Sequence, residues 1–122
     1  MERKRVFVVD DDEDLLKMLR LRLEAEGYEF MFAESGKDMI RIMKMKRPDV
    51  VLLDIMLPEM DGYSALLQIR RENDFKDIPV IIMSAKEKKN VGDLFAFEKI
   101  AFFVEKPFEI GDLLKKIKGL LV

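Results

Sequence analysis

The chain has 122 residues, of which 49% are hydrophobic, so it is long and apolar enough to fold around a core of its own. Its 22 basic and 24 acidic residues are well mixed, give a net charge of −2, and form no basic stripe of the kind that binds nucleic acid. The lack of cysteine and histidine excludes disulfides, thiolate nucleophiles and serine–histidine–aspartate triads. The apolar runs are too short to span a bilayer and the N-terminus does not resemble a secretory signal. We therefore expect a cytoplasmic protein that binds neither nucleic acid nor a membrane.

Strand and helix patterns alternate from the start of the chain. Residues 6–9 (VFVV) form a short apolar run that is typical of a buried parallel strand. The leucine-rich segment after this run predicts a helix capped by Asp12 and stopped by Gly27. Residues 28–33 alternate in polarity and predict an edge strand, and Ser35 resembles the capping residue of a second helix.

The same alternation continues through the rest of the chain. Apolar runs predict three more strands, at 50–53, 80–83 and 101–105. Helical spacing predicts three more helices, at 63–72, 87–99 and 110–121. Five strand–helix units imply an α/β fold, a doubly wound parallel sheet with helices on both faces. We expect one domain over residues 1–122, with no output domain in this chain.

Polar groups that could carry chemistry come directly after four of the five predicted strands. They are Asp10, Asp11 and Asp12 after the first strand, Asp54 after the third, Ser84 after the fourth and Lys106 after the fifth. Ligands of open parallel sheets bind just past these carboxyl ends. Two carboxylates about 4 Å apart repel by roughly 4 kcal/mol at an effective dielectric near 20, so we expect a cation among these aspartates.

Four stretches of the chain together resemble the receiver domain of bacterial two-component response regulators. They are VVDD (8–11), VVLLDIMLPEMDG (50–62), VIIMSA (80–85) and EKPF (105–108). The resemblance covers the whole chain and implies a flavodoxin-like (βα)5 sandwich with a five-stranded parallel sheet in the order 2-1-3-4-5. It implies a phosphorylated signalling switch rather than an enzyme. A sensor histidine kinase would be the phosphodonor, and the downstream protein target is not identified by the sequence.

The resemblance also implies a magnesium (Mg²⁺) site and a nucleophile beside it. Asp54 matches the phosphoryl acceptor, whose ionised carboxylate needs no general base. Asp11 and Asp54 match direct ligands of Mg²⁺, and Asp10 matches a ligand that acts through water. The backbone carbonyl of Met56 would be a further ligand.

The resemblance implies three further roles. Lys106, whose peptide bond to Pro107 is cis in the family, would bind the phosphoryl oxygens as a point charge. The Ser84 hydroxyl would donate to the phosphoryl group. Phe103 would fill the space that Ser84 vacates, so that the switch depends on packing.

Two positions depart from the family's pattern. Lys99 stands where glycine is usual and cannot easily adopt a left-handed helix cap, so we expect an altered end to the 87–99 helix. Phe102 stands where an acidic residue is common. The aromatic segment 94–103 is either ordinary core or an exposed patch for a partner or for self-association, on the face formed by the last two helices and the last strand.

Two other functions stay open on the sequence. A haloacid-dehalogenase-type phosphatase would use Asp10 as its nucleophile, but the chain is short for that fold and Asp54 would have no role. An interaction module that is never phosphorylated would need none of these side chains. A calcium-binding loop is excluded, because Leu15 and Leu21 stand where that loop requires glycine and glutamate.

Overall fold

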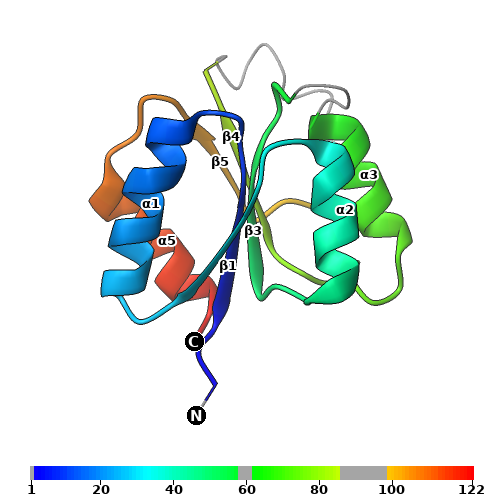
Figure 1. Cartoon of the computed structure of the whole chain (residues 1–122), viewed down its shortest axis with the longest axis horizontal. Helices are drawn as coiled ribbons and strands as arrows, with labels where there is room; N and C mark the ends of the chain where they lie inside the picture. Colours follow the sequence, from blue (N-terminus) through cyan, green and yellow to red (C-terminus); the bar gives the residue numbers. More distant parts are fainter. Residues whose placement is uncertain (1, 58–61, 86–98) are drawn as a thin grey trace.

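The fold is seen in a computed structural model, which describes residues 2–57, 62–85 and 99–122. Five parallel strands form one sheet in the order β2-β1-β3-β4-β5 (Figure 1). The strands are β1 Arg5–Val9, β2 Glu29–Ala33, β3 Val50–Asp54, β4 Val80–Ser84 and β5 Phe102–Glu105. This order confirms the predicted α/β fold, and every strand begins and ends within one residue of its predicted bounds.

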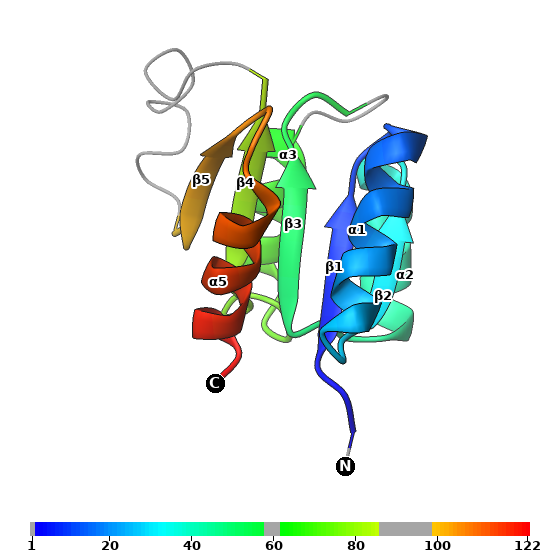
Figure 2. The same ribbon diagram turned by 90° about the vertical axis from the view of Figure 1, so that its left-hand side faces the viewer.

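Helices cover both faces of the sheet. They are α1 Glu13–Ala25, α2 Gly36–Met45, α3 Gly62–Arg71 and α5 Ile110–Leu120. Helices α1 and α5 pack on one face and α2 and α3 on the other (Figures 1 and 2). The predicted helix at 87–99 lies outside the described residues except for Lys99, which is not helical. Within the described ranges, we find no helix with the length and hydrophobicity needed to cross a membrane.

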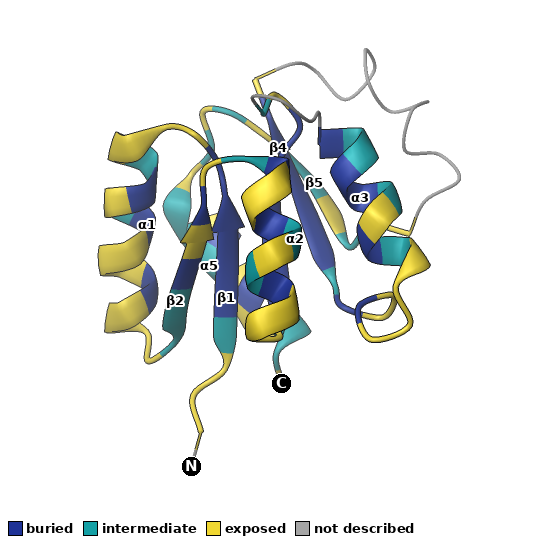
Figure 3. Cartoon of the chain, turned by 45° about the vertical axis from the view of Figure 1, so that its right-hand side comes forward, coloured by how far each residue is buried: buried dark blue, intermediate teal, exposed yellow. Residues whose placement is uncertain are grey.

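The central strands are buried on both sides, as their continuous apolar runs predict (Figure 3). Successive side chains of a strand point to opposite faces, so each central strand serves two cores. In β1, Phe7 and Val9 pack toward α2 and α3, whereas Val6 and Val8 pack toward α1 and α5. The polar ends of these strands are therefore held on rigid, fully buried elements.

The helix ends agree with the capping predictions. The Asp12 carboxylate accepts hydrogen bonds from the backbone N–H groups of Asp14 and Leu15, at 3.0 and 3.1 Å. Gly27 comes after α1 with a φ of 91°, a conformation that favours glycine. The Ser35 hydroxyl accepts from the backbone N–H of Asp38 at 3.2 Å.

The Lys99 position is supported by an arginine from another element. The guanidinium of Arg70, in α3, donates to the Lys99 carbonyl from Nε at 3.1 Å and from Nη2 at 2.6 Å. Its Nη1 donates to the carbonyls of Lys76 and Ile78, at 3.0 and 2.9 Å. One side chain thus ties together the approaches to β4 and β5.

Candidate functional site

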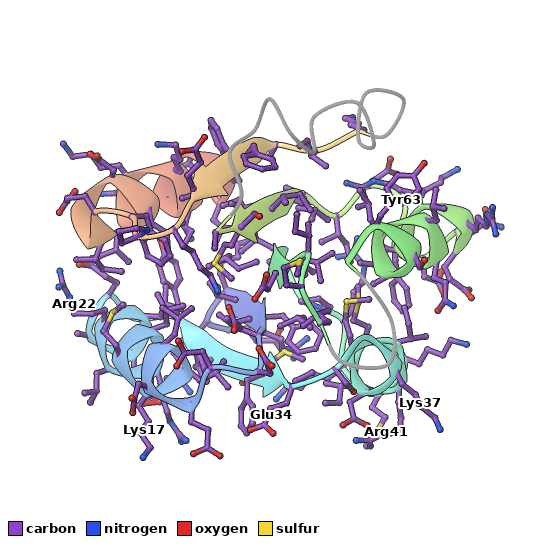
Figure 4. All side chains as sticks on the ribbon, turned by 90° about the horizontal axis from the view of Figure 1, so that it is seen from above. Lys17, Arg22, Glu34, Lys37, Arg41 and Tyr63 are labelled. Carbon is purple, nitrogen blue, oxygen red and sulfur yellow. The ribbon has the colours of Figure 1, made fainter. Side chains whose placement is uncertain are left out.

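The carboxyl ends of the strands meet at one end of the sheet, the end that faces the viewer in Figure 4. Asp10 comes directly after β1, Asp54 is the last residue of β3, and Lys106 comes directly after β5. Strands β1 and β3 pair in register, with Val9 opposite Leu53. Consecutive positions on neighbouring strands therefore place Asp10 beside Asp54.

Three carboxylates converge at this end, and with Lys106 they form what we call the acidic site. Asp10, Asp11 and Asp54 each offer an oxygen, and these oxygens lie within 4.8 Å of one another. Asp10 is fully buried and Asp54 is 5% exposed, whereas Asp11 is open to solvent. The structure thus brings together the three side chains that the sequence predicts as a metal site.

Backbone groups hold the two buried carboxylates in place. Asp10 Oδ1 accepts from the N–H of Asp12 at 2.9 Å, and Asp54 Oδ1 accepts from the N–H of Met56 at 2.9 Å. Their second oxygens both face Lys106, whose Nζ donates to Asp10 Oδ2 at 2.6 Å and to Asp54 Oδ2 at 3.1 Å. The sequence predicts a role for Lys106 at phosphoryl oxygens but does not predict its contact with Asp10. A buried aspartate needs a positively charged partner even when no metal ion is bound, so the burial of Asp10 after an apolar strand is the feature that could have indicated this contact.

Burial and neighbouring charges shift the pKa values of Asp54 and Lys106. Burial is the largest influence on Asp54 and raises the pKa of its carboxyl; the Met56 N–H opposes this and the Asp10 charge reinforces it. Burial lowers the pKa of Lys106, but the hydrogen bond and charge of Asp10, helped by Asp54, outweigh burial and raise the pKa above its ordinary value. Lys106 is therefore a firmly charged ammonium at neutral pH.

The composition of the acidic site suits a divalent cation. With all three carboxylates ionised, the single ammonium of Lys106 leaves an excess of two negative charges. Hard oxygen ligands on one exposed and two buried carboxylates are the donor set that Mg²⁺ prefers. Asp11 is the exposed carboxylate and is therefore the one most accessible to a hydrated ion. The residues present therefore fit the predicted metal.

The remaining predicted residues lie close to this site. Ser84 is fully buried at the end of β4, and its carbonyl accepts from the Lys106 N–H at 2.7 Å. The peptide between Lys106 and Pro107 is cis, as the resemblance implies. Phe103 is half-buried in β5 and packs against the core under α2 and α3. Met56 is 54% exposed, and the metal-binding role of its carbonyl stays a prediction.

The predicted aromatic patch is only partly described. Phe102 is 37% exposed on β5, and the ammonium of Lys116 lies 5.6 Å from the centre of its ring. Residues 94–98 of the patch lie outside the described residues, and Ile100 and Phe103 are partly buried against the core. The use of this face by a partner stays a prediction.

Comparison with known proteins agrees with this fold. The chain belongs to the response regulator receiver domain family, whose sequence model matches residues 6–118. Among curated relatives, it is 32% identical to the probable transcriptional regulator ycf27 of Cyanophora paradoxa, over 99% of this chain and 49% of that protein. It is 33% identical to response regulator MprA of Mycolicibacterium vanbaalenii, over 96% of this chain and 50% of that protein. The chain thus spans about half the length of the curated relatives it matches.

A solved structure gives the same result. The crystal structure of a putative response regulator from Chloroflexus aurantiacus superposes with a TM-score of 0.90 at 28% identity, covering 98% of each chain. The predicted family is therefore confirmed, and the chain is a receiver domain of the two-component signalling type. The haloacid-dehalogenase alternative gains no support from these matches.

Proposed function

We propose that this chain is a phospho-acceptor switch, which takes a phosphoryl group onto Asp54 from a partner sensor histidine kinase in the presence of Mg²⁺. The observation that carries the proposal is the convergence of Asp10, Asp11 and Asp54 with Lys106 at the carboxyl ends of parallel strands. Family membership supports the same conclusion. The chain would take part in its own phosphorylation and dephosphorylation without turning over a separate substrate.

The family resemblance assigns the metal ligands, because both oxygens of Asp10 and both oxygens of Asp54 already accept a hydrogen bond. Asp11 and Asp54 would coordinate the ion directly, Asp10 would act through water, and the Met56 carbonyl would complete the protein ligands. When bound, Mg²⁺ supplies positive charge that neutralises phosphoryl oxygens.

The side chains of the site have distinct roles in this proposal. The Asp54 carboxylate attacks phosphorus through Oδ2, since Oδ1 is held by the Met56 N–H, and the phosphorus–nitrogen bond to the histidine of the donor breaks as the new phosphorus–oxygen bond forms. Lys106 exchanges a carboxylate oxygen for a phosphoryl oxygen, at little cost because both are anionic acceptors. The Ser84 hydroxyl then donates to the phosphoryl group, and Phe103 repacks into the space that Ser84 leaves.

The signal would be a shift between two populations of one fold. The surface that changes is formed by β5, α5 and the segment before β5, and it would be bound by a downstream protein whose identity the sequence does not reveal. We place this exchange in the cytoplasm, where histidine kinases present their phosphoryl groups.

Incubation with Mg²⁺ and a small acyl phosphate, followed by intact mass measurement and peptide mapping, tests the proposal. We expect one phosphoryl group on Asp54, absent in Asp54→Asn and in EDTA. Asp12→Asn is the matched control, because asparagine keeps the helix cap and the residue lies beside the site; it should still be modified.

Other outcomes favour the two alternatives. Modification that persists in Asp54→Asn and disappears in Asp10→Asn would indicate a phosphatase-type nucleophile. If neither acyl phosphates nor histidine kinases modify the wild-type chain, the result would favour an interaction module that is never phosphorylated.

A further inference from the structure

Strand β2 lies at one end of the sheet, with β1 as its neighbour. Natural edge strands are usually protected against pairing by lysine, proline, a bulge or a covering element. The sequence of β2, Glu29–Ala33 (EFMFA), carries no lysine or proline, and it pairs with β1 in an unbroken five-residue register. Its one charged residue, Glu29, stands at the start of the strand and pairs with Arg5 and Lys46, so the stretch from Phe30 to Ala33 carries no charged side chain that would oppose another strand.

The backbone of β2 presents its outer hydrogen-bonding groups at the two phenylalanines. The Glu29 N–H donates to the Lys4 carbonyl at 2.9 Å, and the Ala33 carbonyl accepts from the Asp10 N–H at 3.0 Å, so these residues face β1. Alternate residues of a strand direct their N–H and C=O to opposite sides. Phe30 and Phe32 therefore direct theirs away from β1, toward the outside of the sheet.

The same two residues form an exposed aromatic surface. Their rings stack with centroids 6.0 Å apart, and Phe32 is 47% exposed. They line a shallow groove of about 310 Å³ between β2 and α1, which the buried Leu16 also lines. The guanidinium of Arg20 lies 6.0 Å from the centre of the Phe30 ring and leaves the Phe32 ring open. An accessible strand edge and an apolar groove thus coincide.

The charges around this groove are arranged in two groups. Glu13 and Glu34 lie at the end where the strands finish, and Lys17 and Arg20 lie further along α1, where Arg20 also pairs with Glu24 at 2.7 Å. Figure 4 shows Lys17 and Glu34 on the same side of the molecule, on α1 and just past β2. A two-fold axis reverses the direction of the groove, so it sets the acidic group of one copy toward the basic group of the other. This complementarity favours a second copy of the same chain as the occupant.

We propose that the β2 edge is a docking surface for a second copy of this chain. Antiparallel pairing of the two β2 strands about an axis near Met31 joins the sheets of both copies into one. Phe30 then lies opposite the partner's Phe32, and the outward backbone groups of both residues are satisfied. This interface is on the opposite edge of the sheet from β5, and it does not depend on phosphorylation of Asp54.

Sedimentation over a range of protein concentrations tests the proposal. We expect a concentration-dependent dimer whose dissociation constant rises at least about tenfold in Phe32→Lys, because a lysine at the edge replaces an aromatic pair. Phe102→Lys, on the opposite edge strand, is the matched control and should leave the dimer intact. Circular dichroism confirms that both variants fold. A monomer at all concentrations up to the millimolar range, or a dimer lost in Phe102→Lys and kept in Phe32→Lys, would overturn the proposal.

Charge-reversal variants distinguish a specific loss of this interface from a general loss of stability. The first variant carries Lys17→Glu with Arg20→Glu, and the second carries Glu13→Lys with Glu34→Lys. Each variant alone should be monomeric, and an equimolar mixture should dimerise again, because the two altered grooves complement each other. Failure of the mixture to associate, while the wild type dimerises, would show that the groove does not face its own copy.

Discussion

Lys106 is the residue on which the acidic site depends for its positive charge. Its ammonium is the close positive partner of two carboxylates that burial has removed from water, Asp10 and Asp54. Breaking such a contact by removing one partner costs more than the contact itself is worth, because the other partner is left buried and unpaired. Mg²⁺ would take over part of this role when it binds.

The variant Lys106→Met should therefore lower the free energy of unfolding in EDTA by about 1–3 kcal/mol, the usual cost of an unsatisfied buried acceptor. Excess Mg²⁺ should restore part of the loss, because an ion that binds only the native state stabilises it. Urea unfolding with and without Mg²⁺ measures both effects. Lys37→Met, at an exposed position of α2, is the control and should change stability by less than about 0.5 kcal/mol. An equal loss in both variants would argue against a special role for Lys106.

Glu109 is a second residue whose charge affects the fold. Its carboxylate caps α5 and accepts from the N–H groups of Gly111 and Asp112, at 2.9 and 2.7 Å. The Gly111 and then the Asp112 hydrogen bond lower the pKa of Glu109. A carboxyl with a lowered pKa stabilises the native state above the ordinary glutamate pKa, and this contribution is lost as the pH falls through the lowered value.

We expect Glu109→Gln to be less stable than the wild type at pH 7, and the difference to shrink as the pH falls below about 4. Urea unfolding of both proteins at a series of pH values gives the difference directly. Glu2→Gln, at an exposed residue before β1, should match the wild type throughout. A difference for Glu109→Gln that stays constant down to low pH would mean that the carboxylate charge is not its cause.

At the scale of elements, the start of α3 packs closely on the end of β3. A Cβ added to Gly62 would clash with the Cα of Ile55 and lie 2.7 Å from the carbonyl oxygen of Asp54. The Gly62 N–H also donates to the Ile55 carbonyl at 3.0 Å. The helix therefore fixes the backbone that carries Asp54, and only glycine permits this approach.

Gly62→Ala should lower stability by about 1–3 kcal/mol, the usual cost of overpacking, and should slow phosphorylation of Asp54. Gly119→Ala is the matched control in α5, where an added Cβ meets nothing within 4 Å. Since alanine favours helices over glycine, the control should gain up to about 1 kcal/mol. Thermal unfolding compares the two. If both variants gained stability, the close packing of Gly62 would be contradicted.

Arg70, in α3, should stabilise the segment that leads into β5. In Arg70→Lys, one ammonium cannot reproduce the guanidinium fork that reaches three carbonyls. We expect a loss of about 1–2 kcal/mol and faster hydrogen exchange at Ala101, whose N–H donates to the Val80 carbonyl at 2.8 Å. Arg71→Lys, an exposed neighbour in the same helix, should change neither quantity. Unchanged exchange at Ala101 in Arg70→Lys would contradict this account.

At the scale of the whole molecule, the features that the sequence predicts best are those with a local pattern. Apolar runs mark the strands, and the polar residue after each run has to lie at the same end of a parallel sheet. Asp10, Asp11 and Asp54 could therefore be placed together from the sequence alone. The resemblance to receiver domains added the strand order and the metal.

Contacts between distant segments were not predictable in this way. The Lys106–Asp10 pair joins residues 96 positions apart, and the Arg70–Lys99 contact joins residues 29 apart. Both depend on how far a long flexible side chain reaches in the folded state, for which the sequence has no periodic signal. Movement at the end of β4 and in β5 on phosphorylation stays a prediction, because a switch is a difference between two states.

A crystal structure grown with Mg²⁺ and beryllofluoride, an analogue of the phosphoryl group, tests the central claim most directly. We predict one Mg²⁺ about 2.1 Å from oxygens of Asp11 and Asp54, the analogue on Asp54, and the Lys106 ammonium moved from Asp10 to a fluoride. A structure with the analogue on Asp10, or with the metal away from these carboxylates, would contradict it.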